Sequence, residues 1–117
     1  MTPATAWTFL VIAGLLEVCW AVGLKVSNGF TRPLASVVTI ALMLASFYFL
    51  ARALKVIPVG TGYAVWTGIG SVGAAAVGMI YFKEPVTALR LGCIALIVAG
   101  IVGLKVFSPA GSPVATP

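Results

Sequence analysis

A single carboxylate stands inside a long apolar stretch near the start of the chain. Glu17 lies within a run from Ala6 to Leu24 that contains no other charged residue. A charged side chain near the centre of a bilayer costs roughly 2.5 to 3.5 kcal/mol on insertion scales, so an acid kept there usually has a function. The chemistry open to it is the binding of a cation. The alternative is a neutral Glu17 that hydrogen-bonds a neighbouring helix.

Helical spacing gives Glu17 small neighbours and one large aromatic residue. Positions three and four apart share one face of a helix, which puts Gly14 and Ala21 on the same side as the acid. Gly14 is therefore expected to line a site at Glu17, because small side chains leave room there for a ligand or a partner helix. Trp20, three residues further on, can place its indole N–H or its ring beside the same space.

Two later apolar runs carry side chains that could reach the same depth. Ser46 lies near the middle of the second run, where its hydroxyl can donate to a carboxylate or, alternatively, to a carbonyl of its own helix. Tyr63 and Trp66 share a face in the third run, and aromatic faces attract cations. Together with the acid, these residues predict a cation-binding box. The alternative for Trp20, Tyr63 and Trp66 is a belt at the membrane interface.

The composition shows what kind of element must hold these residues. Of 117 residues, 62% are hydrophobic and 8% are charged, which excludes a soluble domain with a polar surface. The net charge of +5 does not indicate nucleic acid binding, because the seven basic residues are scattered between apolar runs. An all-α integral membrane protein is predicted, with no enzymatic activity, metal site or cofactor. Cys19 and Cys93 are expected to be packing residues.

Charged residues divide the chain into four apolar segments that are long enough to cross a bilayer. About 20 residues of α-helix span the hydrocarbon core. One four-helix transmembrane domain is expected over residues 1–107, with spans at about 5–25, 33–52, 58–82 and 87–107, and a flexible tail at 108–117. The connections are short, so consecutive helices are antiparallel neighbours. Trp7 is expected to lie at a membrane interface.

Small residues give the third and fourth spans different expected roles. Gly68 and Gly70 lie in a glycine-dense span, where they form a hinge or, alternatively, allow close helix packing. Gly92, Leu96 and Gly100 form one stripe on the fourth span, which carries almost no polar side chains. A span that has rows of small residues on its surface and almost no polar side chains is predicted to be the dimerisation helix.

Basic residues are almost evenly divided between the two ends of the predicted spans. Three lie on the side of the N-terminus and four on the other: Arg52, Lys55 and Lys105, against Lys25, Arg32, Lys83 and Arg90. Since an excess of Lys and Arg on the cytoplasmic side fixes orientation, this chain can insert both ways. Four helices also enclose little space and contain no inverted repeat. An antiparallel dual-topology homodimer is expected; the alternatives are a parallel homodimer and a subunit of fixed orientation.

Four stretches of this chain carry recognisable motifs. They are GLLEVCWA at 14–21, LKVSNGFTR at 24–32, SFYFL at 46–50 and PVGTGYAVWTGIG at 58–70. From Ala6 to about Val106 the chain resembles the small multidrug resistance family. Within that family, Trp20, WTGIG at 66–70 and KEPVTALR at 83–90 are similar to the subtype that exports guanidinium. Gly62 stands where an alanine is more usual.

The resemblance implies a homodimer of the inner membrane, antiparallel and of dual topology, that exchanges protons for guanidinium-type cations. Protons and cation would compete for the Glu17 carboxylates of the two subunits, which titrate as a coupled pair. Trp20 and Ser46 would hydrogen-bond the carboxylate, and Tyr63 and Trp66 would complete the cavity. The alternatives are a broader exporter of quaternary ammonium and multidrug cations by the same mechanism, a membrane assembly subunit without transport, and a channel.

Overall fold

The computed structural model describes residues 1–107, which form four α-helices. They are α1 (Pro3–Val26), α2 (Pro33–Ala53), α3 (Val59–Tyr81) and α4 (Ala88–Phe107). By length and composition, each of them could cross a membrane. The prediction of an all-α chain with four membrane-length helices is therefore confirmed. The tail predicted at 108–117 lies outside the described residues.

Prolines and a tight reversal set the limits of the first two helices. Both α1 and α2 have proline in the first turn, where its missing N–H leaves no helix bond unmade. The Thr2 side chain caps α1 by accepting a hydrogen bond from the Thr5 backbone N–H at 3.1 Å. Between the two helices, Asn28, Gly29 and Phe30 have positive φ, a conformation that glycine and asparagine adopt most readily. The short reversal brings α1 and α2 together as antiparallel neighbours.

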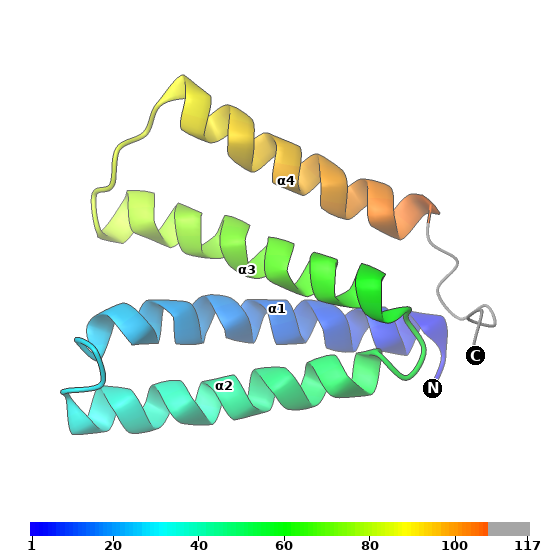
Figure 1. Cartoon of the computed structure of the whole chain (residues 1–117), viewed down its shortest axis with the longest axis horizontal. Coiled ribbons are helices and arrows are strands. Elements are labelled where there is room, and N and C mark those ends of the chain that lie inside the picture. Colours follow the sequence, from blue (N-terminus) through cyan, green and yellow to red (C-terminus); the bar gives the residue numbers. More distant parts are fainter. Residues whose placement is uncertain (108–117) are drawn as a thin grey trace.

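The helices lie in a row in the order α2, α1, α3, α4 (Figure 1). α1 packs against both α2 and α3, whereas the backbone of α4 lies close to α3 alone among the described helices. The buried hydrophobic core draws on α1, α2, α3 and the α2–α3 connection, and α4 contributes no buried residue. The most buried part of the described chain therefore lies among the first three helices.

The structure shows the surroundings of Trp7, Cys19 and Cys93. Trp7 is only 9% exposed, and Lys105 Nζ of α4 lies 5.1 Å from the centre of its ring, so the end of α4 covers the start of α1. Cys19 and Cys93 are exposed free thiols. They are not enclosed within the described part of the chain, and their role as packing residues stays a prediction.

Candidate functional site

Glu17 projects from the middle of α1 onto the backbone of α3. A side-chain carbon at position 70 would collide with the Glu17 carboxylate, so only glycine leaves room for the acid there. Close contacts continue on both sides of it along the two helices. We call this contact the α1–α3 seam; it comprises Gly14, Glu17 and Val18 of α1 and Ile69, Gly70 and Gly73 of α3.

Two buried polar atoms, one in the seam and one beside it, make no hydrogen bond within the described part of the chain. The buried Oε1 atom of Glu17 has no hydrogen-bond partner within the described part of the chain, and neither has Nε1 of Trp20. A buried polar atom without a partner costs roughly 1–3 kcal/mol. The bond from Trp20 to Glu17 that the resemblance implies is therefore absent from this structure, and an acceptor and a donor lie one helical turn apart.

Ser46 joins three helices through one hydroxyl group. Its Oγ donates to the Ala13 carbonyl of α1 at 2.7 Å and accepts a hydrogen bond from Trp66 Nε1 of α3 at 3.0 Å. A serine has one hydroxyl proton, so the expected bond from Ser46 to the Glu17 carboxylate is not made here. Instead of touching the acid, Ser46 fixes the orientation of the Trp66 indole.

Four aromatic rings from three helices gather beside this hydroxyl. We call Trp20, Phe47, Tyr63 and Trp66 the aromatic cluster. Trp66 is its centre, with ring centroids 6.4 Å from Trp20, 6.0 Å from Phe47 and 5.4 Å from Tyr63. Trp66 is buried and hydrogen-bonded within the chain, which argues against a place in an interfacial belt. Tyr63 is 56% exposed and lies at the open edge of the cluster.

Phe47 is a member of this cluster that the sequence analysis missed. Its ring lies 6.1 Å from that of Trp20, which closes the triangle with Trp66. The available signal was its position directly after Ser46 in the SFYFL stretch.

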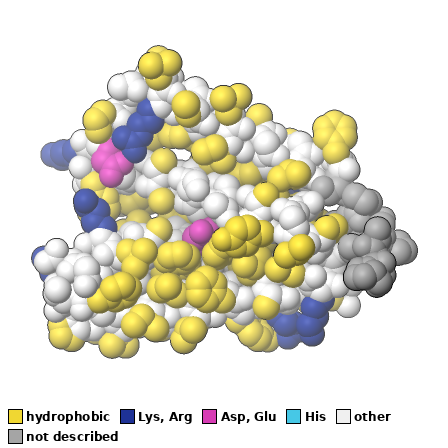
Figure 2. Space-filling view, in the orientation of Figure 1, with side chains coloured by type: hydrophobic (Ala, Val, Ile, Leu, Met, Phe, Trp, Pro, Cys, Tyr) yellow, Lys and Arg dark blue, Asp and Glu magenta, His cyan; other side chains and the backbone are white. Residues whose placement is uncertain are grey.

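Seen from one side of the molecule, acidic atoms lie near the middle of the face beside a gathering of hydrophobic side chains (Figure 2).

The glycines expected to act as a hinge lie where other side chains approach α3. A Cβ at Gly68 would be 2.8 Å from Ile101 of α4, and Gly70 faces Glu17. α3 is one continuous helix from residue 59 to residue 81. These contacts favour the alternative of close helix packing, and the hinge stays a prediction.

The stripe expected to dimerise faces away from the rest of the described chain. A Cβ added at Gly92 or Gly100 would meet nothing within 4 Å. Leu96, between them, is 73% exposed. The stripe is therefore free for contact with lipid or with another copy of the chain.

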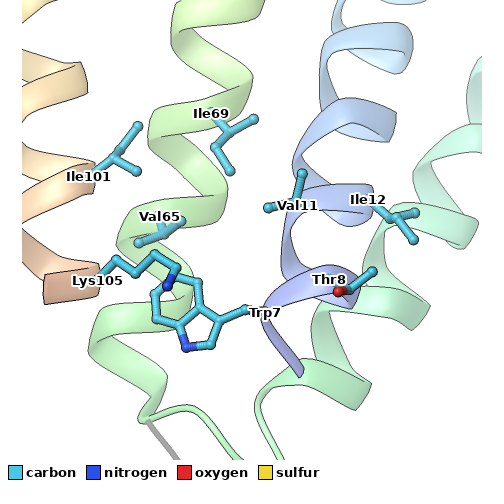
Figure 3. Close-up of a pocket in the computed structure, with 8 residues that line it drawn as sticks. All are labelled: Trp7, Thr8, Val11, Ile12, Val65, Ile69, Ile101 and Lys105. Carbon is cyan, nitrogen blue, oxygen red and sulfur yellow. The ribbon is translucent and has the colours of Figure 1, made fainter. Parts of the chain in front are cut away.

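A separate groove of about 370 Å³ runs between α1, α3 and α4 (Figure 3). Its lining is almost entirely apolar, and the Lys105 ammonium lies at one end beside Trp7. None of Glu17, Trp20 and Ser46 lines it. Because it offers a cation no carboxylate and a repelling charge, the groove does not suit the predicted chemistry.

A family model described as Small Multidrug Resistance protein matches residues 5–97. The chain belongs to the small multidrug resistance family. The match includes Glu17, Ser46 and the whole aromatic cluster, so the candidate site lies inside the region that defines the family. With four membrane-length helices, this family member is a multi-pass protein of the inner membrane.

Several enterobacterial proteins of this family are similar along most of the chain, and each is named guanidinium exporter. The Escherichia coli K12 protein is 57% identical over 100 residues, which are 86% of this chain and 95% of the relative. The Citrobacter freundii protein is 55% identical over the same shares. The Yersinia pseudotuberculosis protein is 53% identical over 103 residues, 88% of this chain and 99% of the relative.

Proposed function

We propose that this chain exports guanidinium and small substituted guanidinium cations in exchange for protons. The names of relatives that are 53% to 57% identical support the substrate. The observation that carries the proposal at the site is the Glu17 carboxylate, which lies on Gly70 one turn from the Trp20 ring with Oε1 unpaired. A planar cation with N–H donors along its edge can pair with a carboxylate while its face lies against an indole.

The proposal includes an antiparallel homodimer in which both Glu17 carboxylates meet in one cavity. Support comes from the near balance of basic residues at the two ends and from the exposed Gly92, Leu96 and Gly100 stripe, which would form the dimer contact. Tyr63, at the open edge of the aromatic cluster, would then border the shared cavity. Four helices alone enclose too little space for alternating access.

Exchange follows from competition for the same pair of acids. When the pair is deprotonated it binds the cation; when protons arrive from the acidic side, they neutralise the pair and the cation leaves. The two acids titrate together because each one's charge acts on the other. Ser46 holds the Trp66 face towards the cavity, Gly14 lets Ile69 of α3 pack closely beside the acid, and bending at Gly68 and Gly70 accompanies the change of access.

Currents on solid-supported membranes test this function directly. Wild-type protein in liposomes should give guanidinium-dependent currents that Glu17→Gln abolishes, and guanidinium binding should weaken as the pH falls because protons occupy the same acids. Ser71→Ala is a matched control, since the Ser71 hydroxyl is exposed and bonds only the Thr67 carbonyl of its own helix.

Each other outcome points to a different function. Guanidinium accumulation by Glu17→Gln protein would exclude the exchange mechanism. Currents with large quaternary ammonium ions and none with guanidinium would identify the broader exporter. The absence of any Glu17-dependent current would leave an assembly subunit.

A further inference from the structure

Both acidic residues of the chain lie against glycines of α3. Glu17 lies on Gly70, and Glu84, in the α3–α4 connection, lies against Gly78, where a Cβ would collide with its carboxylate. Gly70 and Gly78 are eight residues apart, which is about 12 Å along a helix. A cation that leaves Glu17 along α3 towards this end of the helix therefore meets Glu84 next.

A cavity of about 160 Å³ lies between α1 and α3 beyond the packed seam, on the side of Glu84. Ala21, one turn beyond Glu17, and Ala74, one turn beyond Gly70, line its inner part, and Glu84 lines it near the end of α3. One water needs only about 10–15 Å³ of such space, so a cation of four heavy atoms fits together with water. Val18, which packs against Gly73, thus separates the Glu17 carboxylate from a small cavity lined by the second carboxylate, and a passing cation needs this contact to open.

Glu84 already holds a guanidinium group, which belongs to Arg90. Arg90 Nη2 donates to Glu84 Oε1 at 2.6 Å, and Arg90 Nη1 donates to the Pro85 carbonyl at 3.2 Å. A carboxylate oxygen and a carbonyl oxygen are therefore spaced to accept hydrogen bonds from two nitrogens of one planar guanidinium. The side chains of Arg90 and Glu84 are 33% and 38% exposed. Solvent reaches about a third of each side chain and screens the pair, so a free cation can compete with Arg90 for the carboxylate.

We propose that Glu84 and the Pro85 carbonyl form a transit site, where exported guanidinium takes the place of the Arg90 side chain. The proposal rests on the proposed function, since it takes guanidinium as the cargo. Lys25 lines the same cavity, with Nζ 5.3 Å from the centre of the Phe82 ring. Its positive charge keeps the site weak, which suits a station on an exit route because a bound ion must also leave.

Two neutral variants of the ion pair give the decisive comparison. Glu84→Gln should lower the maximal guanidinium flux of reconstituted dimers at least five-fold and change equilibrium binding at Glu17 less than two-fold. Arg90→Gln removes the internal competitor and leaves the carboxylate, so its flux should equal or exceed that of the wild type. If the ion pair served only to hold the α3–α4 connection, both variants would lose flux equally, and that result would overturn the proposal.

A binding measurement keeps the proposal testable apart from transport. In Glu17→Gln protein, the amide signal of Gly78 and the guanidinium signal of Arg90 should shift on titration with guanidinium chloride and not with sodium chloride of equal ionic strength. Adding Glu84→Gln should remove the shifts. Shifts that persist in the double variant, or that never occur in the single one, would refute the transit site.

The same experiments separate this proposal from the proposed function. A wild-type protein without guanidinium flux would refute the function. Guanidinium flux that is normal in wild type and equally reduced in Glu84→Gln and Arg90→Gln would refute the transit site alone.

Discussion

Ser46 uses its hydroxyl in two directions, as a donor to Ala13 and as an acceptor from Trp66. Ser46→Ala would leave the buried Trp66 N–H without a partner, which costs roughly 1–3 kcal/mol. We expect a lower unfolding temperature in detergent and weaker guanidinium binding, because the Trp66 ring loses its fixed orientation. Thermal unfolding and calorimetric titration measure the two effects.

Ser71→Ala is the matched control for this prediction. The Ser71 hydroxyl bonds the Thr67 carbonyl of the same helix at 2.7 Å and is exposed. Its loss should change stability by less than about 0.5 kcal/mol. Equal losses of stability in Ser46→Ala and Ser71→Ala would show that the hydrogen bonds of Ser46 between helices contribute nothing to stability.

Gly70 is the residue on which the Glu17 carboxylate lies. Gly70→Ala places a methyl group where the carboxylate is, so the acid must turn away from α3. We expect guanidinium binding to weaken at least ten-fold, although alanine by itself favours a helix by about 1 kcal/mol. Gly60→Ala on the same helix meets nothing within 4 Å and should bind normally. If Gly70→Ala bound guanidinium normally but transported it slowly, the main role of Gly70 would be bending of α3 and not making room for the Glu17 carboxylate.

The candidate site shows which residue properties follow from sequence. The placing of Tyr63 beside Trp66 could be predicted, because helical spacing fixes which residues share a face. The partner of Ser46 could not be predicted, since a bond to a carbonyl 33 residues away depends on the register between two helices. The expected hydrogen bonds from Trp20 and Ser46 to Glu17 are absent for the same reason, because they too depend on how the helices lie against one another.

At the scale of helices, the long apolar runs bounded by Lys, Arg and Pro were sufficient to predict four spans. The order of the row was not predictable, because it depends on which small residues meet. α1 lies beside α3 at positions such as Gly14, where a Cβ would be 2.7 Å from Ile69. Many glycines occur in α3, and only their contacts show which of them matter for the seam.

The fourth helix allows a test of the proposed dimer contact. Gly100→Leu adds bulk to a stripe that touches nothing else in the described chain, so it should weaken dimerisation at least ten-fold without unfolding the monomer. Energy transfer between labelled copies in liposomes, measured over a range of protein-to-lipid ratios, gives the dissociation constant.

Val102→Leu serves as the control for this helix. Val102 is 55% exposed and lies about 200° around the helix from Gly100, so it enlarges a different face. It should leave dimerisation unchanged. Similar weakening by both variants would place the dimer contact elsewhere.

For the whole molecule, basic residues are nearly balanced between the two ends of the spans. We therefore expect a single substitution of a basic residue to change the fraction of chains inserted in each orientation. The N-terminal side carries three basic residues against four at the other end. Lys55→Gln leaves two against four and should favour the orientation with the Lys25 end in the cytoplasm. Lys83→Gln leaves three against three and should keep both orientations populated.

Labelling of single cysteines from each side of the membrane, in a background without Cys19 and Cys93, measures these populations. Export by Lys55→Gln should fall as one orientation becomes scarce, and coexpression with a variant of opposite bias should restore it. A wild-type protein found in one orientation only would exclude the antiparallel dimer.

The separation of α4 from the site has a consequence for how such proteins diversify. The acid and the aromatic cluster belong to α1, α2 and α3, while the backbone of α4 lies close to α3 alone within the described chain and its side chains reach α1 near Trp7. After a gene duplication, changes in α4 could alter which copies pair without altering the recognised cargo. Two copies could then become an obligatory pair, each inserted in one direction, while both keep the inherited site.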